Sequence, residues 1–285
     1  MVDDTDAGEA DGAEHGSGEG AAAKAMVAQV FSDSAESYDQ VIEFFAPFGR
    51  ALVAAADLPR GAKVLDVACG RGACLYPALE SVGPEGQVIG IDLALGMVEA
   101  LAADLEARGI TNASVQVGDA EALGFPSGSF DAVLAGFMIF FAPDPDRVLA
   151  EFARVLKPGG TVALTIFDGD TPSAFLRQVG EELFGAQDAR ASEAFDRSEV
   201  LDPALVHAGF TAPMGIDVIE RFRFDSVEQM ERWHRSHFAR LLLEVLNDDQ
   251  LAIYRQRVAE HLAEAEVPGG YQLIQRARVT VATKR

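Results

Sequence analysis

Short apolar runs alternate along this chain with longer stretches in which apolar residues recur every three or four positions. The short runs predict buried strands over 63–68, 87–91, 114–117, 130–135 and 161–167. The longer stretches predict helices over 72–82, 95–108 and 145–156. Strands and helices that alternate in this order indicate an α/β fold, with a parallel sheet and right-handed crossovers.

The pattern changes after residue 168. Helical spacing returns near 172–184, 198–208 and 226–265, with a strand predicted over 216–224. Apolar and charged residues then alternate over 271–283, which predicts a last strand. We expect a final strand pair at an antiparallel edge of the sheet, with a helical cap inserted at about 226–266.

The part of the chain before the first strand divides into two segments. Residues 1–24 are rich in Gly, Ala, Asp and Glu and lack apolar periodicity, which predicts a disordered acidic tail. Residues 25–58 have helical spacing and predict an N-terminal helical arm that closes over a bound cofactor. Residues 59–285 are then expected to form the α/β domain with its cap.

The turn after the first strand is rich in glycine. The segment Asp66-Val67-Ala68-Cys69-Gly70-Arg71-Gly72 ends an apolar run in an acid and leads into a helical pattern. A strand followed by such a turn is typical of nucleotide-binding α/β domains. However, a dinucleotide fingerprint requires a small residue where this chain has Leu75. The Asp66 carboxylate would also repel a pyrophosphate and attract a cation, such as the ammonium of a methionyl group.

The same segment resembles the first motif of the class I S-adenosylmethionine (SAM)-dependent methyltransferases. Residues 154–160 resemble the helix-to-strand turn that precedes strand five in this family. The resemblance covers about residues 60–168 and is closest to the branch of ubiquinone/menaquinone-biosynthesis and small-molecule natural-product methyltransferases. It implies SAM as cofactor and a Rossmann-like seven-stranded sheet, with the N-terminal helical arm and a helical insertion before the last strand.

Acidic residues also follow the next two strands. The resemblance implies that Asp92 accepts hydrogen bonds from both ribose hydroxyls and that Asp119 accepts one from the adenine amino group. Leu93 and Met97 would sandwich the adenine. Tyr38 would reach the cofactor from the arm, with simple packing of the arm as the alternative. The expected cofactor-binding residues are Tyr38, Asp66, Ala68, Gly70, Gly72, Asp92, Leu93, Met97, Gly118, Asp119, Ala120, Ala135 and Phe137.

Composition limits the partners. Lys and Arg total 23 and Asp and Glu total 45, and the resulting formal charge of −22 disfavours binding to nucleic acid or to an anionic membrane. No apolar run reaches the length of a membrane span, and the acidic N-terminus is unlike a signal peptide, so a cytoplasmic protein is expected. The two cysteines, Cys69 and Cys74, are expected to be reduced thiols.

The segment 137–141, after strand four, is wholly apolar where many relatives carry a polar group, which suggests a hydrophobic acceptor. Some of the aromatic residues are expected to line its pocket, the candidates being Phe140, Phe141, Phe175, Phe184, Phe210, Trp233 and Phe238. Some relatives hold magnesium where this chain has Asp144, Asp168 and Asp170. We expect Asp144 to cap a helix instead, and we predict no metal site.

Methyl transfer from a sulfonium depends mainly on positioning, desolvation and removal of one acceptor proton. The candidate catalytic residues are His234 and His237, three positions apart on one side of a predicted helix, together with Tyr38. Packing or surface roles remain the alternative for both histidines.

The leading hypothesis is therefore a SAM-dependent methyltransferase that acts on an oxygen or carbon atom of a small hydrophobic acceptor. The alternative is a SAM-binding cyclase, or a binding module, that transfers no methyl group. The apolar face of the N-terminal arm is compatible with packing on its own domain and with exchange between copies in a homo-oligomer.

Overall fold

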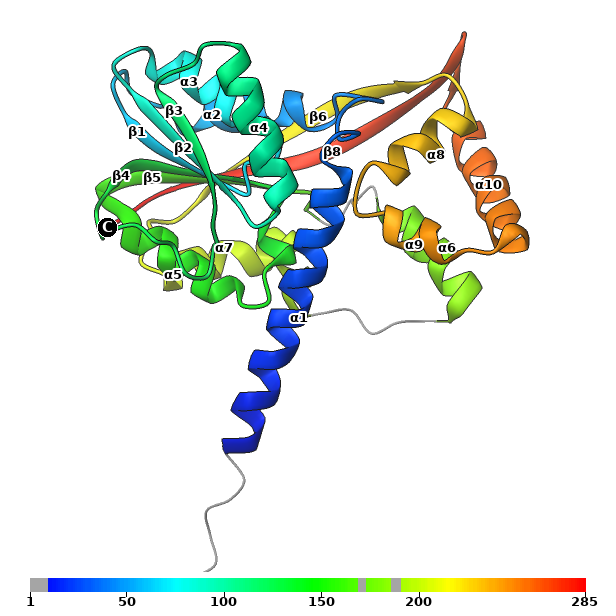
Figure 1. The fold of residues 1–285 in the computed structure, drawn as a ribbon, viewed down its shortest axis with the longest axis horizontal. Coiled ribbons are helices and arrows are strands. Elements are labelled where there is room, and N and C mark those ends of the chain that lie inside the picture. The colour runs from blue at the N-terminus through cyan, green and yellow to red at the C-terminus, as the bar shows by residue number, and fades with distance from the viewer. Residues whose placement is uncertain (1–9, 169–172, 186–190) are drawn as a thin grey trace, which may run out of the picture.

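The computed structural model describes residues 10–168, 173–185 and 191–285. Its centre is a sheet with the strand order β3-β2-β1-β4-β5-β8-β6 (Figure 1). The first five strands run parallel to one another, and β8 lies antiparallel between β5 and β6. The strands are β1 (Lys63–Val67), β2 (Gln87–Asp92), β3 (Ala113–Val117), β4 (Phe130–Gly136), β5 (Leu156–Ile166), β6 (Met214–Phe224), β7 (Glu266–Val267) and β8 (Gly270–Thr283).

This topology confirms the predicted Rossmann-like class, with its antiparallel edge. The seven predicted strands are all present, and the two-residue β7 adds an eighth by pairing with β8. The sheet reverses its order between β1 and β4, so the carboxyl ends of these strands face a natural ligand-binding crevice.

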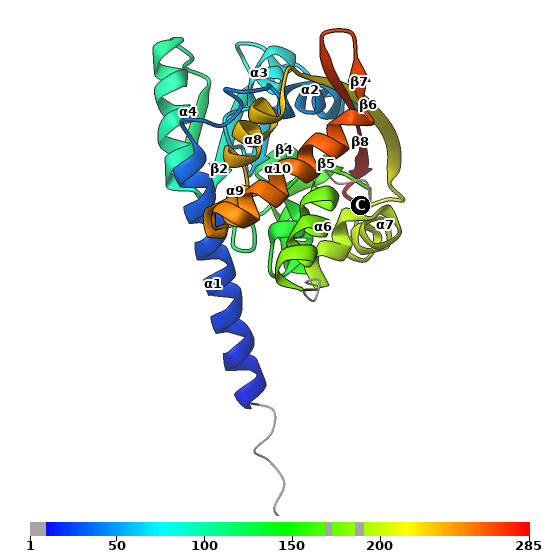
Figure 2. The same cartoon turned by 90° about the vertical axis from the view of Figure 1, so that its right-hand side faces the viewer.

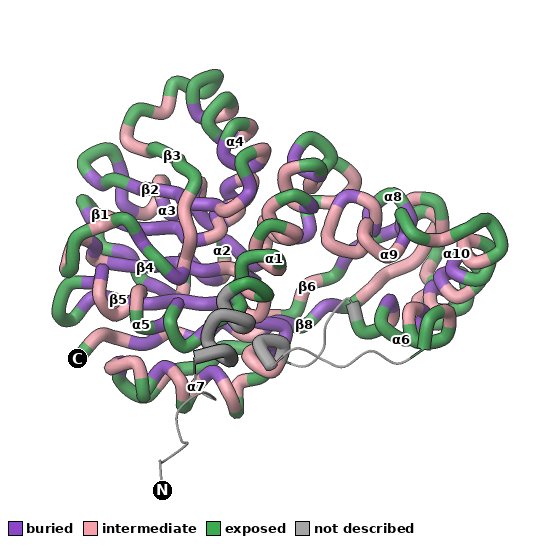
Figure 3. Tube along the Cα trace, turned by 60° about the horizontal axis from the view of Figure 1, so that its bottom comes forward, coloured by how far each residue is buried: buried purple, intermediate pink, exposed green. Residues whose placement is uncertain are grey.

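Helices cover both faces of the sheet because alternate residues of each strand point to opposite sides. Val64 packs toward α2 (Phe45–Ala56), α3 (Leu75–Val82) and α4 (Leu95–Ala107). Leu65 packs toward α5 (Pro145–Val155) and α7 (Ser198–His207). Buried residues are accordingly concentrated in the strands and on the helix sides that face them (Figure 3).

Four helices form a separate helical lobe beside the end of the sheet at which β6 ends and β8 begins (Figures 1 and 2). They are α6 (Ser173–Phe184), α8 (Val227–Arg235), α9 (Arg240–Val245) and α10 (Asp248–Ala263). Ser226 caps α8, and Asn247 forms a capping box with Gln250 at the start of α10. Helices α8 to α10 occupy the insertion expected from the sequence, and α6 joins them from before β6. Two short 3-10 turns, η1 (Ile139–Phe141) and η2 (Ala191–Asp196), follow β4 and α6.

The N-terminal segment differs from the prediction. Helix α1 spans Ala10–Ser34, so the disordered tail expected over 1–24 is wrong from Ala10 onward, and residues 1–9 lie outside the described part. Tertiary contacts hold this helix on the domain: Lys24 pairs with Asp119 and Glu121, and Gly96 of α4 donates its N–H to the Ser32 hydroxyl at 3.2 Å. Arg71 also donates to the Ala35 carbonyl at 2.6 Å. The arm therefore packs on its own domain.

Candidate active site

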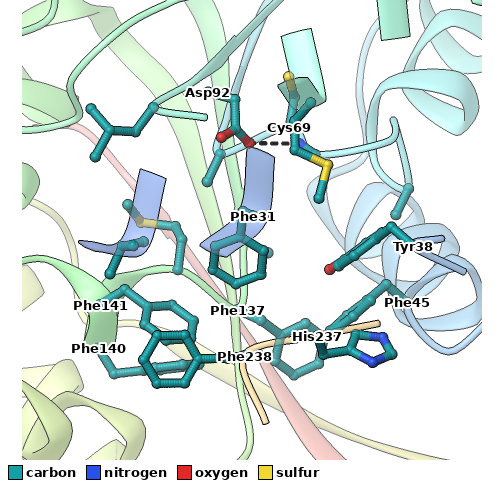
Figure 4. Close-up of a pocket in the computed structure, with 18 of the residues that line it drawn as sticks. Phe31, Tyr38, Phe45, Cys69, Asp92, Phe137, Phe140, Phe141, His237 and Phe238 are labelled. Carbon is teal, nitrogen blue, oxygen red and sulfur yellow. Dashed lines mark hydrogen bonds between the residues drawn. The ribbon is translucent and has the colours of Figure 1, made fainter. Parts of the chain in front are cut away.

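A cavity of about 750 Å³ opens at the carboxyl ends of β1 to β5, and α1 and the helical lobe close its other sides. Small-molecule sites have volumes of roughly 300–1,000 Å³, so the size suits a ligand of this class. Figure 4 shows Asp92 at one end of the cavity and a group of aromatic rings at the other, with Phe31 of α1 between them.

Asp66 is the last residue but one of β1, and it lines the cavity. The residue is 1% exposed, and one carboxylate oxygen, Oδ2, has no hydrogen-bond partner among the described residues. Burial raises the pKa of Asp66 well above its ordinary value, and the nearby Asp92 carboxylate raises it further. An unpartnered buried carboxyl is costly, so this atom marks a position at which a cationic ligand would be stabilised.

The glycine turn brings backbone donors to the second acid. Ala68 and Gly70 both have left-handed backbone angles, with φ of 55° and 49°, and Gly70 donates its N–H to Asp92 Oδ2 at 2.9 Å. Ala94 donates its N–H to Asp92 Oδ1, also at 2.9 Å. The carboxylate of Asp92 is thus held by backbone donors and, with about four lone-pair positions, keeps capacity to accept from a ligand hydroxyl. Leu93 and Met97 line the cavity beside it.

The expected residues after β3 also line the cavity, but Asp119 has a partner that the sequence did not reveal. Lys24 of α1 donates to Asp119 Oδ2 at 2.8 Å and to Glu121 Oε2 at 2.5 Å. The Glu121 backbone N–H donates to Asp119 Oδ1. Gly118 and Ala120 stand on either side of this group in the cavity wall. Lys24 is the only Lys or Arg before Arg50, which was the one available signal for its role.

Two residues of the expected cofactor set do not line the cavity. Gly72 has φ of 86°, and a Cβ added there would lie 2.8 Å from the Tyr76 ring, so this glycine serves the packing of the turn. Ala135 is 1% exposed and packs in the core on the α5 side of the sheet, because its side chain points away from the cavity. Phe137, two residues later, does reach the cavity and stacks on Phe167, with ring centroids 4.3 Å apart.

Both candidate histidines lie in the wall that the helical lobe supplies. His234 shares a hydrogen bond of 2.7 Å between its Nδ1 and the Tyr254 hydroxyl, and His237 Nδ1 lies 2.6 Å from the Trp233 carbonyl oxygen. The Nε2 atoms of both histidines are buried without a partner among the described residues. Burial lowers the pKa of His234 to about 3 and that of His237 to about 4, so both rings are neutral at physiological pH.

Tyr38 joins His237 at this end of the cavity. Its ring stacks on Phe45 and lies 5.1 Å from the His237 ring, centroid to centroid. Burial raises the pKa of Tyr38 well above its ordinary value, with added repulsion from Asp39 and Asp92. The phenol therefore stays protonated and can donate a hydrogen bond but is a poor base.

The aromatic candidates divide into two groups. Phe140, Phe141, Trp233 and Phe238 line the cavity. Phe210 is fully buried in the main core, Phe184 is largely exposed, and Phe175 lines a smaller cavity beneath the helical lobe. Four further aromatic residues line the main cavity and were not predicted to do so from the sequence: Phe31, Phe44, Phe45 and Phe167. Three of these belong to the arm and α2, whose apolar spacing is the same as that of an ordinary packing face.

The acidic residues considered for magnesium have structural partners. Asp144 caps α5 by accepting the Arg147 N–H at 3.0 Å, as expected, and Asp168 accepts the Ser198 N–H at 2.7 Å. Asp170 lies outside the described residues. Within the described ranges no three His, Cys, Asp or Glu side chains are grouped as metal ligands. Cys69 and Cys74 are buried and unpaired with each other.

The residues present fit SAM. The orphaned Asp66 carboxylate suits its ammonium, the backbone-held Asp92 carboxylate suits its ribose, and Leu93 and Met97 supply apolar surface for its base. The backbone turn at Ala68 and Gly70 leaves open space, because a Cβ on Gly70 would meet nothing within 4 Å.

Comparisons with known proteins agree with this geometry. Residues 64–160 match the family described as "Methyltransferase domain". The chain is 36% identical to nocamycin O-methyltransferase of Saccharothrix syringae over 85% of its own length and 92% of that protein. It is 46% identical to aklanonic acid methyltransferase DauC of Streptomyces sp. (strain C5) over 50% of its length and 65% of that protein, slightly less than two thirds. The solved structure of a putative methyltransferase from Bacillus halodurans C-125 shares the fold, with a TM-score of 0.57, 20% identity and coverage of 82% of this chain and 98% of that one.

The fold and the cavity define a class I methyltransferase. The chain belongs to the SAM-dependent methyltransferase family, since the similarity to nocamycin O-methyltransferase extends over nearly the whole of both proteins. The predictions of family, fold class, enzyme class and cofactor are thereby confirmed. No helix within the described ranges is both long enough and apolar enough to cross a membrane.

Proposed function

We propose that this protein transfers the methyl group of SAM to an oxygen or carbon atom of a small hydrophobic acceptor. The observation that carries the proposal is the continuity of the cavity, which joins an acidic, glycine-rich end to an aromatic end. The relatives support it, because their names describe an O-methyltransferase of nocamycin and a methyltransferase of aklanonic acid, both small molecules. The formal charge of −22 favours such an acceptor over nucleic acid.

At the acidic end, Asp66 would hold the ammonium and Asp92 the ribose hydroxyls. The Gly118-Asp119-Ala120 segment would border the adenine between Leu93 and Met97. When bound, SAM supplies an activated methyl group for an in-line displacement. The side chains of this protein then have to orient the acceptor, exclude water and hold a proton.

At the aromatic end, stacked rings would hold a flat, apolar acceptor. Phe137 stacks on Phe167, and Phe141 lies within 5.6 Å of Phe31 and 5.1 Å of Phe238, centroid to centroid. These rings exclude water from the cavity, which strengthens polar contacts made inside it.

His237 is neutral because burial lowers its pKa to about 4, and its ring offers a free nitrogen to the hydroxyl of an acceptor. The Trp233 carbonyl can only accept a hydrogen bond, so Nδ1 of His237 carries the hydrogen and Nε2 carries a lone pair. That lone pair lacks a partner and belongs to a residue that lines the cavity. We propose that Nε2 of His237 accepts the hydrogen of the hydroxyl group on the acceptor, with His234 beside it. The neutral Tyr38 phenol would orient the same oxygen.

A cytoplasmic location suits the two free cysteines.

Mass spectrometry of products from a panel of phenolic and acidic polycyclic acceptors tests this function. A product heavier by one methyl group, formed only with SAM, supports methyl transfer. An isomer of unchanged mass would instead support the cyclase alternative, and an unmodified acceptor that still binds would support a binding module.

The histidine role has its own test. His237→Gln is expected to lower kcat about 100-fold on a hydroxyl acceptor, within the usual range for loss of general base catalysis, with little change in SAM affinity. His207→Gln is the matched control, because His207 is an exposed residue of α7 and does not line the cavity. Unchanged kcat in His237→Gln would remove this residue from the chemistry and leave the rest of the proposal standing.

A further inference from the structure

Strand β6 forms one edge of the sheet. All eleven of its residues pair with β8 on one side, and no strand of the described residues pairs with its other side (Figure 1). In an antiparallel ladder alternate residues turn their N–H and C=O groups away from the partner, so the outer edge of β6 presents unpaired backbone groups. Apolar side chains accompany this edge: Met214 is 57%, Ile216 37% and Ile219 43% exposed.

Charged residues on an edge strand usually prevent pairing with other chains. The charges of β6, however, have an arrangement that complements itself. Ile219 is the middle residue of the strand, with Asp217 two positions before it and Arg221 two positions after it. When two copies pair antiparallel about Ile219, Asp217 of each copy lies opposite Arg221 of the other, on the same face of the sheet.

Neither charge has an ion-pair partner within its own chain, so far as the described residues extend. Arg278 is the neighbour of Asp217 on β8, but its guanidinium pairs with Asp202 at 2.6 Å. Arg221 lies beside Ile274, which is 54% exposed. Pairing of two copies would therefore satisfy charges that the single chain leaves to solvent.

The neighbouring registers are less favourable. A pair centred on Val218 places Asp217 opposite Ile219 and Arg221 opposite Gly215, so neither charge is matched. A pair centred on Glu220 brings Glu220 against its own copy, which is repulsive. Only the pair centred on Ile219 also matches all eleven residues from end to end and places the two exposed Ile219 side chains against each other.

We propose that this protein forms a two-fold symmetric homodimer in which the β6 strands of two copies pair antiparallel about Ile219. The two sheets then become one continuous sheet, and the active-site cavities lie on separate copies. This contact does not involve α1, and it is independent of the proposed function.

Sedimentation velocity of the full chain over a range of concentrations, at about 0.15 M salt, tests the proposal. The wild type is expected to sediment as a dimer. Asp217→Arg places two positive pairs across the two-fold axis, and Arg221→Asp places two negative pairs there. The dimer of each variant is therefore expected to dissociate at a concentration about tenfold higher or more than the wild-type dimer. An equimolar mixture of the two variants is expected to restore a dimer, because every pair across the two-fold axis is then opposite in charge.

Arg276→Asp is the matched control for Arg221→Asp, because it makes the same change of charge. Arg276 is an exposed residue of the neighbouring strand β8, opposite Ile219. It is expected to leave the dimer intact. A wild type that is monomeric at every concentration would overturn the proposal. So would a dimer that both single variants retain, a result that would point instead to exchange of the N-terminal arm. Thermal unfolding of each variant separates loss of the dimer from loss of the fold.

Discussion

At the scale of single residues, Asp66 has surroundings that make physical sense only with a cationic ligand. Its carboxyl is buried, one oxygen is unpartnered, and the nearby charge is the carboxylate of Asp92. A group whose folded-state pKa is raised destabilises the fold at pH values above its unfolded pKa, and the cost grows until the pH passes the folded-state pKa. The residue therefore makes the ligand-free protein less stable in return for a site that binds a cation.

Asp66→Asn should therefore shift two properties in opposite directions. We expect the ligand-free protein to gain on the order of 1 kcal/mol in unfolding free energy at pH 7, because a neutral amide is cheaper to bury than a carboxylate. We expect SAM affinity to fall about tenfold or more. Thermal unfolding and calorimetric titration measure the two effects. Asp131→Asn is the control, because Lys157 holds the pKa of Asp131 below its usual value. Loss of the Asp131 carboxylate should therefore cost stability without changing SAM binding.

Single residues also show where sequence reasoning about the site ends. Asp66, Gly70 and Asp92 could be identified because the strand, turn and helix pattern that places them is local. The partnership of Lys24 with Asp119 could not, because the two lie 95 residues apart and no local pattern links them. Gly72 and Ala135 were assigned to the cofactor from their place in a motif, yet Gly72 gives the Tyr76 ring room to pack and the Ala135 side chain lies in the core.

At the scale of elements, the contact between α1 and α4 holds one wall of the cavity in place. Gly96 is the residue that permits it, since a Cβ there would lie 2.5 Å from the Ser32 carbonyl oxygen. Phe31 and Lys24, which line the cavity, are carried by the same helix. Displacing α1 at Gly96 would therefore open the adenine end and the aromatic end together.

Gly96→Ala is thus expected to loosen α1 without unfolding the domain. Hydrogen exchange of the amides in 18–34 should accelerate at least about tenfold, while the amides of β1 and β4 stay protected. SAM affinity should fall as Lys24 leaves Asp119. Gly124→Ala is the control, because a Cβ on Gly124 meets nothing within 4 Å. Protection of α1 that is the same in both variants would show that the arm does not depend on this contact.

The elements that the sequence predicted well are those with a strong local period. Strands β1 to β5 and helices α4 and α5 were located because buried strands and amphipathic helices impose their own spacing. Helix α1 was missed over residues 10–24 because four glycines and few apolar residues disfavour an isolated helix there, whereas its contacts with α4 and Asp119 come from distant parts of the chain.

At the scale of the whole molecule, the carboxyl ends of the parallel strands supply the acidic end of the cavity. The aromatic end is built jointly by α1, α2, the segments after β4 and β5, and the helical lobe. The single tryptophan, Trp233, lies at this end and is 6% exposed. Its fluorescence is therefore an internal reporter of occupancy of the aromatic end.

The most direct test of the account is calorimetric titration of the full chain with SAM, repeated in two buffers of different ionisation enthalpy. We expect binding in the micromolar range that is lost in Asp92→Ala. We also expect proton release on binding, because a cation beside Asp66 lowers the raised pKa of that carboxyl, so affinity should increase as pH rises. An absence of heat with SAM together with a clear signal from NAD would contradict the account.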